Sequence, residues 1–476
     1  MEGWNFFPVF QNGFGFGTDF LPVGGELTEE WKMDCIENWR ITNFGLAAHD
    51  IAQIAEQLFA PALDEFAPLV AEALLGFLLW QFCFWHHHGT IRALLLAVRL
   101  GYHCGMNKAS QAMTTGTKRR VIVVGAGIMG ASFAWHLARA GVDVLVFDER
   151  PGAGEIATAN SWAWINSSWG NPEPYFRLRH RSMTLWRELA QHIPDLRVNW
   201  CGGLLWDLPG QDLVAFAKLH GEWGYGVRLV EKAEIAKLEP RLRQLPDLAA
   251  HVGEEGMVEP VAAANAMVKA AEALGAKFMW NSGVEDLITA DNGVIGVCTT
   301  EAEYIADEVV LANGLGAAPL ITQLGYDFAI DGPPGLLVHT SPLPPVLNGL
   351  VMSPHLHVRQ SAEGRLVAGS DFGGMEPGDD PAGAAQKLFT ELRQFLLGAD
   401  NMKLDFHTVG FRPTPRDGVS AIGRVKNTNG LYICVTHSGI TLAPVLGDLG
   451  AAEILTGNRD HLLQGFSPDR LLEPVA

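Results

Sequence analysis

The sequence is poor in positive charge and in cysteine, and each shortage excludes a class of protein. Its 476 residues include 34 Lys and Arg against 53 Asp and Glu, which gives a net charge of −19. Because binding to a phosphate backbone needs a basic surface, this balance argues against nucleic acid as a partner. The six cysteines are scattered, without a CxxC pair or a Cys/His cluster at zinc-ligand spacing, so the sequence predicts no metal site and no disulfide framework.

The first residues also lack the pattern of a secretory signal. The stretch MEGWNFFPVFQNGFGFGTDF has no basic segment followed by an apolar one. Together with the scattered thiols, this predicts a cytoplasmic protein. The length favours two or three domains, and 53 glycines and 26 prolines indicate a globular chain with many turns.

Residues 1–112 differ in composition from the rest, being rich in aromatics and leucine without regular turn signals. Their longest apolar run, 68–85, is near the length that spans a bilayer, but Glu72 and Gln81 interrupt it, which favours a buried or interfacial helix over a span. The consecutive histidines 86–88 cannot all face one ion. We expect an N-terminal extension, helical or poorly ordered, that is either an appendage or the product of a start assigned upstream of Met113.

From residue 118 onward, strand and helix patterns alternate, which predicts an α/β architecture. The pattern predicts strands at 120–124, 142–147, 308–312, 365–368 and 431–435, and helices at 128–140, 172–192 and 260–275.

The stretch VIVVGAGIMGASFAWHLARAGVDVLVFDER, which begins at Val121, carries a dinucleotide-binding pattern. Gly125 permits the tight turn from strand to helix, Gly127 lets the backbone approach a pyrophosphate, and Gly130 lets helix and strand pack closely. The helix N-terminus would offer N–H groups to the phosphates. Asp148 follows the second strand, where its carboxylate can bind both ribose hydroxyls, which disfavours NADP but leaves FAD and NAD open.

The order of motifs from about 118 to 458 resembles the D-amino acid oxidase (DAO) superfamily of FAD-dependent oxidoreductases, which includes glycine oxidase, sarcosine oxidase and D-amino acid dehydrogenase. The motifs that carry the resemblance are GEIATANSWAWIN, GMVEPVAAANAMVKAAEALGAKFMWNSGVEDL, VVLANGLGA, VGFRPTPRDGVSAIG and GLYICVTHSGITLAPVLGDLGAAEILTG. The resemblance implies a Rossmann-like FAD-binding domain interleaved with a mixed-sheet substrate domain. It places the FAD-binding domain in residues 118–170, 255–325 and 405–460, and the substrate domain in residues 171–254 and 326–404. Residues 461–476 remain as a C-terminal tail.

The resemblance also implies which residues contact FAD. They are Gly125, Ala126, Gly127, Ile128, Met129, Gly130, Asp148, Glu149, Thr158, Ala159, Asn160, Ser161, Val284, Ala312, Asn313, Gly314, Gly439, Ile440, Thr441 and Leu442. The stretch after Arg412 reads Pro413, Thr414, Pro415, without the cysteine that tethers flavin in monomeric sarcosine oxidases, so we expect non-covalent FAD.

On the substrate side, Arg412 matches the arginine that binds the substrate carboxylate in glycine oxidase-like members. A planar guanidinium can hold a carboxylate in two parallel hydrogen bonds, although pairing with Asp417 is the structural alternative. Glycine oxidase-like members often have an arginine at the position of His437 and a tyrosine at the position of His357. Each histidine therefore either shapes the pocket or packs as an ordinary buried histidine.

The resemblance therefore implies oxidation of the C–N bond of a small amino or N-alkyl amino acid by hydride transfer to flavin, followed by hydrolysis of the imine. Oxygen or a quinone or other electron carrier would accept the electrons. Two alternatives stay open at this point. One is a membrane-associated amino acid dehydrogenase that docks through 68–85 and reduces quinone, and the other is a non-catalytic flavin-binding subunit.

Overall fold

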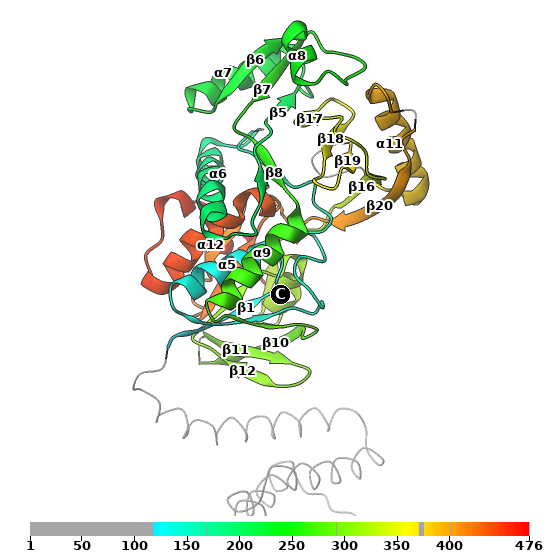
Figure 1. Cartoon of the computed structure of the whole chain (residues 1–476). Coiled ribbons are helices and arrows are strands. Elements are labelled where there is room, and N and C mark those ends of the chain that lie inside the picture. The colour runs from blue at the N-terminus through cyan, green and yellow to red at the C-terminus, as the bar shows by residue number, and fades with distance from the viewer. Residues whose placement is uncertain (1–117, 169, 292, 371–375, 400, 476) are drawn as a thin grey trace, which may run out of the picture. The chain divides into compact units, whose positions relative to one another are not determined.

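The structure, a computed structural model, describes residues 118–168, 170–291, 293–370, 376–399 and 401–475 (Figure 1). The expectations for 1–112, including the apolar run and the three histidines, lie outside the described residues. The described chain has a mixed α/β fold with several sheets, as the sequence predicts.

A six-stranded sheet forms the centre of the fold. Its strands come from distant parts of the sequence, and all neighbours are parallel except β22 and β23. In spatial order they are β22 (Ala421–Arg424), β23 (Leu431–Val435), β13 (Glu308–Leu311), β1 (Arg120–Val124), β2 (Asp143–Phe147) and β9 (Lys277–Met279). Four of the five β1 residues are buried, as expected for a parallel strand covered on both faces.

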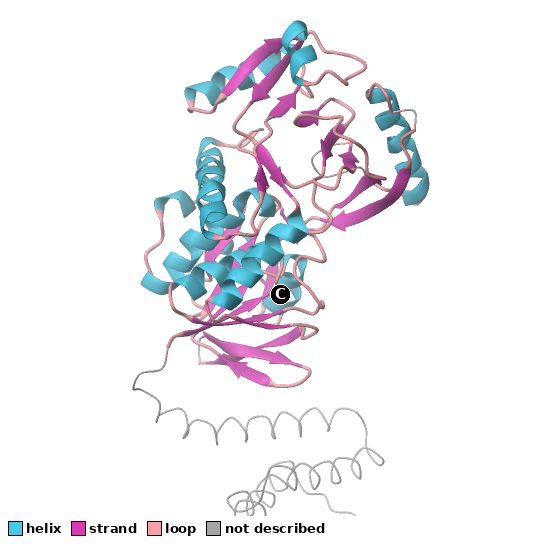
Figure 2. Cartoon of the chain, viewed as in Figure 1, coloured by secondary structure: helices cyan, strands magenta, loops and turns pink. Residues whose placement is uncertain are grey.

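Helices cover one face of this sheet (Figure 2). They include α5 (Ile128–Arg139), α9 (Pro260–Ala273) and α12 (Gly439–Thr456), and α6 (Glu173–His192) packs on α12. The close contact of α12 with α5 depends on missing side chains, because a Cβ at Gly447 would lie 2.2 Å from Ser132 Oγ and one at Gly450 would lie 2.5 Å from the Phe133 ring. The other face packs against α10 (Ala317–Thr322) and a three-stranded sheet of β10 (Val284–Ala290), β11 (Gly293–Thr299) and β12 (Glu303–Ile305).

An eight-stranded sheet makes up the second large layer, antiparallel except between β17 and β5. Its order is β20 (Leu404–Phe411), β16 (Pro334–Thr340), β19 (Leu366–Gly369), β18 (His357–Gln360), β17 (Leu350–Met352), β5 (Gly203–Leu205), β7 (Leu248–Val252) and β6 (Val227–Glu231). Helices α7 (Gly210–Glu222), α8 (Lys232–Leu238) and α11 (Pro381–Phe395) pack beside it. We keep the division into two interleaved domains as a proposal.

Short elements complete the described chain. Strands β3 (Trp164–Ile165), β8 (Gly256–Val258) and β4 (Val198–Asn199) form one small sheet. Two strand pairs join β14 (Tyr326–Phe328) to β24 (Leu472–Pro474) and β15 (Ile330–Asp331) to β21 (Thr414–Pro415). Three 3₁₀ turns lie at Gly314–Gly316, His461–Leu463 and Pro468–Leu471.

The expected segments match the observed ones closely where the pattern is strong. Strands 120–124 and 431–435 have the predicted bounds, and the helices expected at 128–140 and 172–192 each differ by one residue at one end. The helix expected at 260–275 ends at Ala273, because Gly275, with a φ of +102°, closes it in a turn. Among the described helices, Gly439–Thr456 alone is long and apolar enough to cross a membrane, but 67% of it is buried inside the fold, as in a core helix.

Candidate functional site

One pocket opens at the carboxyl ends of the central strands, where ligands bind in open α/β sheets. Val124, Ala312 and Val435, at the ends of β1, β13 and β23, line it. Its volume is about 610 Å³, within the range of pockets that hold small molecules and cofactors. Segments far apart in the sequence therefore meet around one cavity.

Glycine is required at one position in the turn between β1 and α5 and at another in the first turn of α5. Gly125 has a φ of +93°, and a Cβ there would lie 2.7 Å from Asn313 Cα. A Cβ at Gly130 would lie 1.8 Å from the Gly125 carbonyl oxygen, so only glycine lets α5 pack this close to the turn. Gly127 differs, because a Cβ there would meet only Thr158 Oγ1 at 3.4 Å. Its missing side chain leaves space on the pocket side.

The N-terminus of α5 is arranged to receive an anion. The helix has no acidic residue in its first turn and no side-chain cap from Gly127, while Ile128 N donates to Thr158 Oγ1 at 3.1 Å. The positive end of the helix dipole and its unpaired N–H groups therefore face the pocket, as suits a pyrophosphate.

Asp148 is fixed at the end of β2. Its carboxylate accepts hydrogen bonds from Ala126 N at 2.6 Å and Arg150 N at 2.8 Å. Burial raises the pKa of Asp148, and the two backbone N–H donors oppose that shift. The turn, the helix end and this acid together fit the diphosphate and ribose of a dinucleotide.

Most of the residues expected to contact FAD line this one pocket. They are Gly125, Gly127, Ile128, Met129, Asp148, Glu149, Thr158, Asn160, Ser161, Val284, Ala312, Asn313, Gly314, Gly439, Ile440 and Thr441. Ala126, Gly130, Ala159 and Leu442 are not among the lining residues. The individual contacts of all twenty residues with FAD stay predictions.

A second helix N-terminus faces the same pocket. Helix α12 begins after Ser438, has no acidic residue in its first turn, and places Gly439, Ile440 and Thr441 in the pocket wall. Thr441 Oγ1 donates to Trp164 O at 2.9 Å, and Ser182 Oγ donates to Thr441 O at 2.6 Å. These bonds hold the start of α12 in place.

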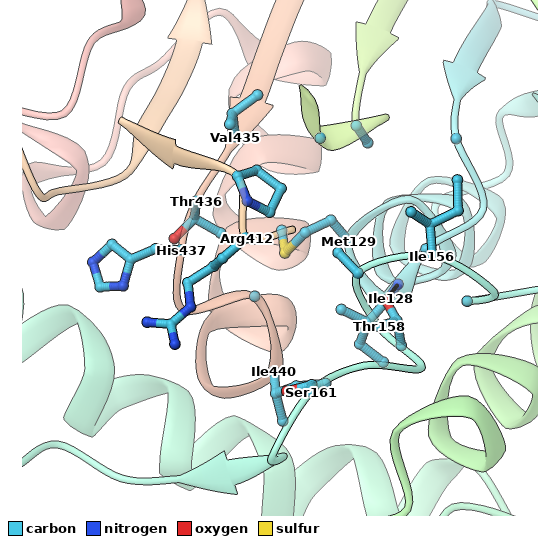
Figure 3. Close-up of a pocket in the computed structure, with 18 of the residues that line it drawn as sticks. Ile128, Met129, Ile156, Thr158, Ser161, Arg412, Val435, Thr436, His437 and Ile440 are labelled. Atoms are coloured by element: carbon cyan, nitrogen blue, oxygen red, sulfur yellow. Dashed lines mark hydrogen bonds between the residues drawn. The ribbon is translucent and has the colours of Figure 1, made fainter. Parts of the chain in front are cut away.

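Arg412 lies at the other end of the pocket, directly after β20. Its backbone N–H donates to Pro333 O at 3.2 Å, and its side chain points into the pocket (Figure 3). Asp417 is the alternative partner expected for Arg412. Its carboxylate instead accepts hydrogen bonds from Arg470, from Nε at 2.5 Å and from a terminal guanidinium nitrogen at 3.1 Å. Asp417 is therefore held by Arg470, and Arg412 borders the pocket.

His437 also lines the pocket, near Arg412 (Figure 3). Its Nε2 donates to Gly418 O at 2.9 Å, and its Nδ1 accepts from Ser438 Oγ at 3.0 Å. Burial, with the charges of Arg179 and Arg412, lowers the pKa of His437 to about 4. The imidazole is therefore neutral at neutral pH.

Comparison with known proteins settles the family. The profile of the family described as DAO, FAD dependent oxidoreductase, matches residues 120–453. The chain belongs to the DAO family. It is therefore an FAD-dependent oxidoreductase, as its sequence predicts.

Similar proteins cover most of this DAO-family chain. Glycine oxidase from Bacillus licheniformis is 26% identical over 367 residues, which are 73% of this chain and 96% of the relative. The crystal structure of glycine oxidase from Geobacillus kaustophilus has a TM-score of 0.68 at 23% identity. The match covers 74% of this chain and 99% of the glycine oxidase chain. The crystal structure of L-proline dehydrogenase from P. horikoshii also has a TM-score of 0.68, at 22% identity. The match covers 75% of this chain and 98% of the dehydrogenase chain.

His357 of this DAO-family enzyme is not among the residues that line the pocket. It lies on β18, buried, with Nε2 3.2 Å from Asp207 Oδ2 and its ring 5.9 Å from that of Trp162. Trp162 does line the pocket, so it stands between His357 and the cavity. A role for His357 in the site stays a prediction, and it would be exerted through this indole.

Two buried charged residues were not predicted from the sequence, Arg179 in the pocket wall and Glu255 behind the lining residues Trp164 and Ser168. Glu255, fully buried, accepts hydrogen bonds from Trp164 Nε1 at 2.9 Å and Ser168 Oγ at 2.5 Å. Tyr225 OH donates to the same carboxylate. Arg179 could have been found, because it lies four residues after Tyr175 and seven before Trp186, on the buried stripe of its helix. Glu255 lies in a loop and carries no such signal.

Among the described residues, no three His, Cys, Asp or Glu side chains gather as metal ligands.

Proposed function

We propose that this DAO-family enzyme oxidises the C–N bond of a small amino or N-alkyl amino acid. The observation that carries the proposal is that a turn shaped for a dinucleotide and an inward-pointing arginine, Arg412, border one pocket (Figure 3). The names of similar proteins support it, because glycine oxidase and L-proline dehydrogenase both act on amino acids.

Arg412 would bind the substrate carboxylate. A guanidinium forms two parallel, charge-assisted hydrogen bonds with a carboxylate, which fixes the direction of the adjacent Cα–H bond. Holding the reacting carbon in one orientation supplies a large part of the rate enhancement in such reactions.

In the proposed reaction, the Cα–H bond breaks with its electron pair and the nitrogen loses a proton, which leaves an imine. FAD, when bound, supplies the acceptor for the hydride. Water then hydrolyses the imine to a carbonyl product and an amine. The N-terminus of α12, with Gly439, Ile440 and Thr441 in the pocket wall, would stabilise negative charge through its N–H groups.

We also propose that FAD binds without a covalent link and that oxygen or a quinone reoxidises it. Cys434 supports the first part. It lines the pocket but is buried, and burial raises the pKa of its thiol far above neutrality. The thiolate that a covalent attachment needs is therefore absent at neutral pH.

The test is an absorbance spectrum of the purified protein, followed by anaerobic addition of pooled D-amino acids, glycine, sarcosine and proline. We expect flavin bands that bleach with at least one pool. Bands that persist with every pool would contradict the proposed substrate class, and a colourless protein that cannot take up FAD would contradict the cofactor assignment.

A further inference from the structure

A second arginine, Arg179 on α6, lines the same pocket and is 6% exposed. Its Nε donates to Asn166 O at 3.2 Å, and its two terminal nitrogens donate to Ser438 Oγ at 2.9 Å and Asn166 Oδ1 at 2.5 Å. A guanidinium has five N–H groups, so these bonds use three. Within the described part of the chain, no acceptor takes the other two.

All three partners of Arg179 are neutral, which is unusual for a buried charge. The other buried arginine among the described residues, Arg359, forms an ion pair with Glu259 at 3.3 Å. No described carboxylate pairs with Arg179. A buried cation at a pocket wall without a counter-ion indicates that a ligand supplies the negative charge.

Burial lowers the pKa of Arg179, and Tyr175, Tyr225 and then Glu255 oppose that shift, but Glu255 is not a hydrogen-bond partner of Arg179. The Glu255 oxygens accept from Trp164, Ser168 and Tyr225, and burial raises the pKa of Glu255 to about 7. The carboxyl is therefore already satisfied by neutral donors and carries only part of a charge at neutral pH.

Arg179 and Arg412 approach the same part of the pocket from different elements. Arg179 belongs to α6, whereas Arg412 follows β20. Both charges help to lower the pKa of His437, and Arg179 is linked to that imidazole through Ser438. Two cations thus flank one neutral histidine in the pocket wall.

We propose that Arg179 binds a second carboxylate of the substrate, so that the enzyme prefers amino or N-alkyl amino acids with two carboxylates to those with one. This rests on the proposed function, in which Arg412 holds the carboxylate next to the reacting carbon. Arg179 then acts as a specificity residue, and its two remaining N–H groups meet the second carboxylate.

The experiment uses the FAD-loaded enzyme and two ligands that contain sulfur in place of the amine, so neither can be oxidised at a C–N bond. Thiodiacetate carries two carboxylates and (methylthio)acetate carries one. Dissociation constants come from the change in the flavin absorbance spectrum. We expect thiodiacetate to bind at least about tenfold more tightly to the wild type, since an added charge-assisted contact is of that order.

Variants separate the two arginines. Arg179→Met should remove the preference for the dicarboxylate while leaving binding of (methylthio)acetate within about twofold, because that ligand has no second carboxylate. Arg412→Met should weaken both ligands. Arg181→Met is the matched control, since Arg181 lies two residues away on the same helix with 44% of its side chain exposed, and it should change neither constant.

Equal affinity of the wild type for the two ligands would overturn the inference, and so would a preference that survives in Arg179→Met. Loss of FAD from Arg179→Met would also overturn it, because it would assign Arg179 to the cofactor. If that variant does not fold, Arg179→Lys keeps the charge at a shorter reach and should retain part of the preference. Failure of the proposed function gives a different result, namely that no amine bleaches the flavin whichever ligand binds.

Discussion

The two ends of the pocket are built in different ways. The nucleotide end consists of backbone and missing side chains, with Gly125, Gly127 and Gly130 in one short turn and Asp148 on the neighbouring strand. The other end consists of charged side chains from separate elements, among them Arg179 and Arg412. The first end recognises a ligand by shape and N–H groups, and the second by charge. We therefore expect a change at the first end to affect folding or cofactor retention, and a change at or behind the second to affect substrate binding and the pH dependence of stability.

The sharpest way to break this comparison lies in the glycine turn. Gly130→Ala places a Cβ 1.8 Å from the Gly125 carbonyl oxygen, within backbone that cannot move without displacing β1. We expect a loss of more than about 4 kcal/mol in the free energy of unfolding, measured by denaturant titration, or no soluble protein.

Gly127 is the matched control in the same turn. Gly127→Ala should fold, because its Cβ meets only Thr158 Oγ1 at 3.4 Å. Gly127→Val should fold as well but lose FAD, since its side chain fills the space left for the pyrophosphate. A Gly127→Val protein that is fully yellow would overturn the binding geometry.

The next largest expected effect is on the pH dependence of the free energy of unfolding, through Glu255. Burial raises its pKa from 4.5 to about 7, so between these pH values the folded protein holds a proton that the unfolded chain has lost. This contribution to stability is complete below pH 4.5 and is lost as the pH rises through 7. Glu255→Gln should therefore gain stability relative to the wild type over that range, by on the order of 3 kcal/mol.

The measurement is denaturant unfolding at several pH values and one FAD concentration. Glu254→Gln is the control with the opposite sign. Although burial opposes it, hydrogen bonds from His180 and Gly226 N lower the pKa of Glu254, so its contribution is lost as the pH falls. If the difference between Glu255→Gln and the wild type does not change with pH, Glu255 is ionised throughout.

Arg412→Ala tests the charged end by kinetics. The variant should raise the KM for a carboxylate substrate by about two decades, equivalent to about 2.7 kcal/mol, because two charge-assisted hydrogen bonds are lost. Arg416→Ala is the control, since Arg416 is 57% exposed and pairs with Asp331 at 3.2 Å. Unchanged kinetics in Arg412→Ala would remove Arg412 from the site.

The smallest effect is expected at His437. Its pKa is lowered to about 4, so it is neutral from pH 6 to 8 and adds no titration to the rate profile in that range. His437→Gln can still donate to Gly418 O and accept from Ser438 Oγ, and it should change kcat/KM by less than about threefold. A wild-type transition near pH 6.5 that disappears in this variant would show that the imidazole is charged during turnover.

The contrast between a nucleotide end built within one short segment and an opposite end built from separate elements also explains which site residues the sequence could predict. The glycine turn and Asp148 lie within 24 consecutive residues, so the spacing alone indicates their geometry. Arg412 was found only because its surrounding motif resembles a known family. Arg179 on α6 and Glu255 in the loop before β8 are brought into electrostatic range only by tertiary packing, and no local pattern encodes that proximity. His357 matches a family position, yet in this chain it faces Asp207 behind Trp162.

The strand order of the central sheet has a consequence for synthesis on the ribosome. Among the strands of this sheet β1 and β2 are made first, whereas β13, β23 and the start of α12, which complete the pocket, follow later, α12 more than three hundred residues after β1. Until α12 emerges, the face of α5 that contacts Gly447 and Gly450 lacks this partner, and the N–H groups of α12 that border the cavity do not yet exist. We therefore expect this face of α5 to stay exposed during much of translation, which favours aggregation of the unfinished chain. Because the start of α12 completes the pocket wall, we expect FAD to bind tightly only after this helix has been made.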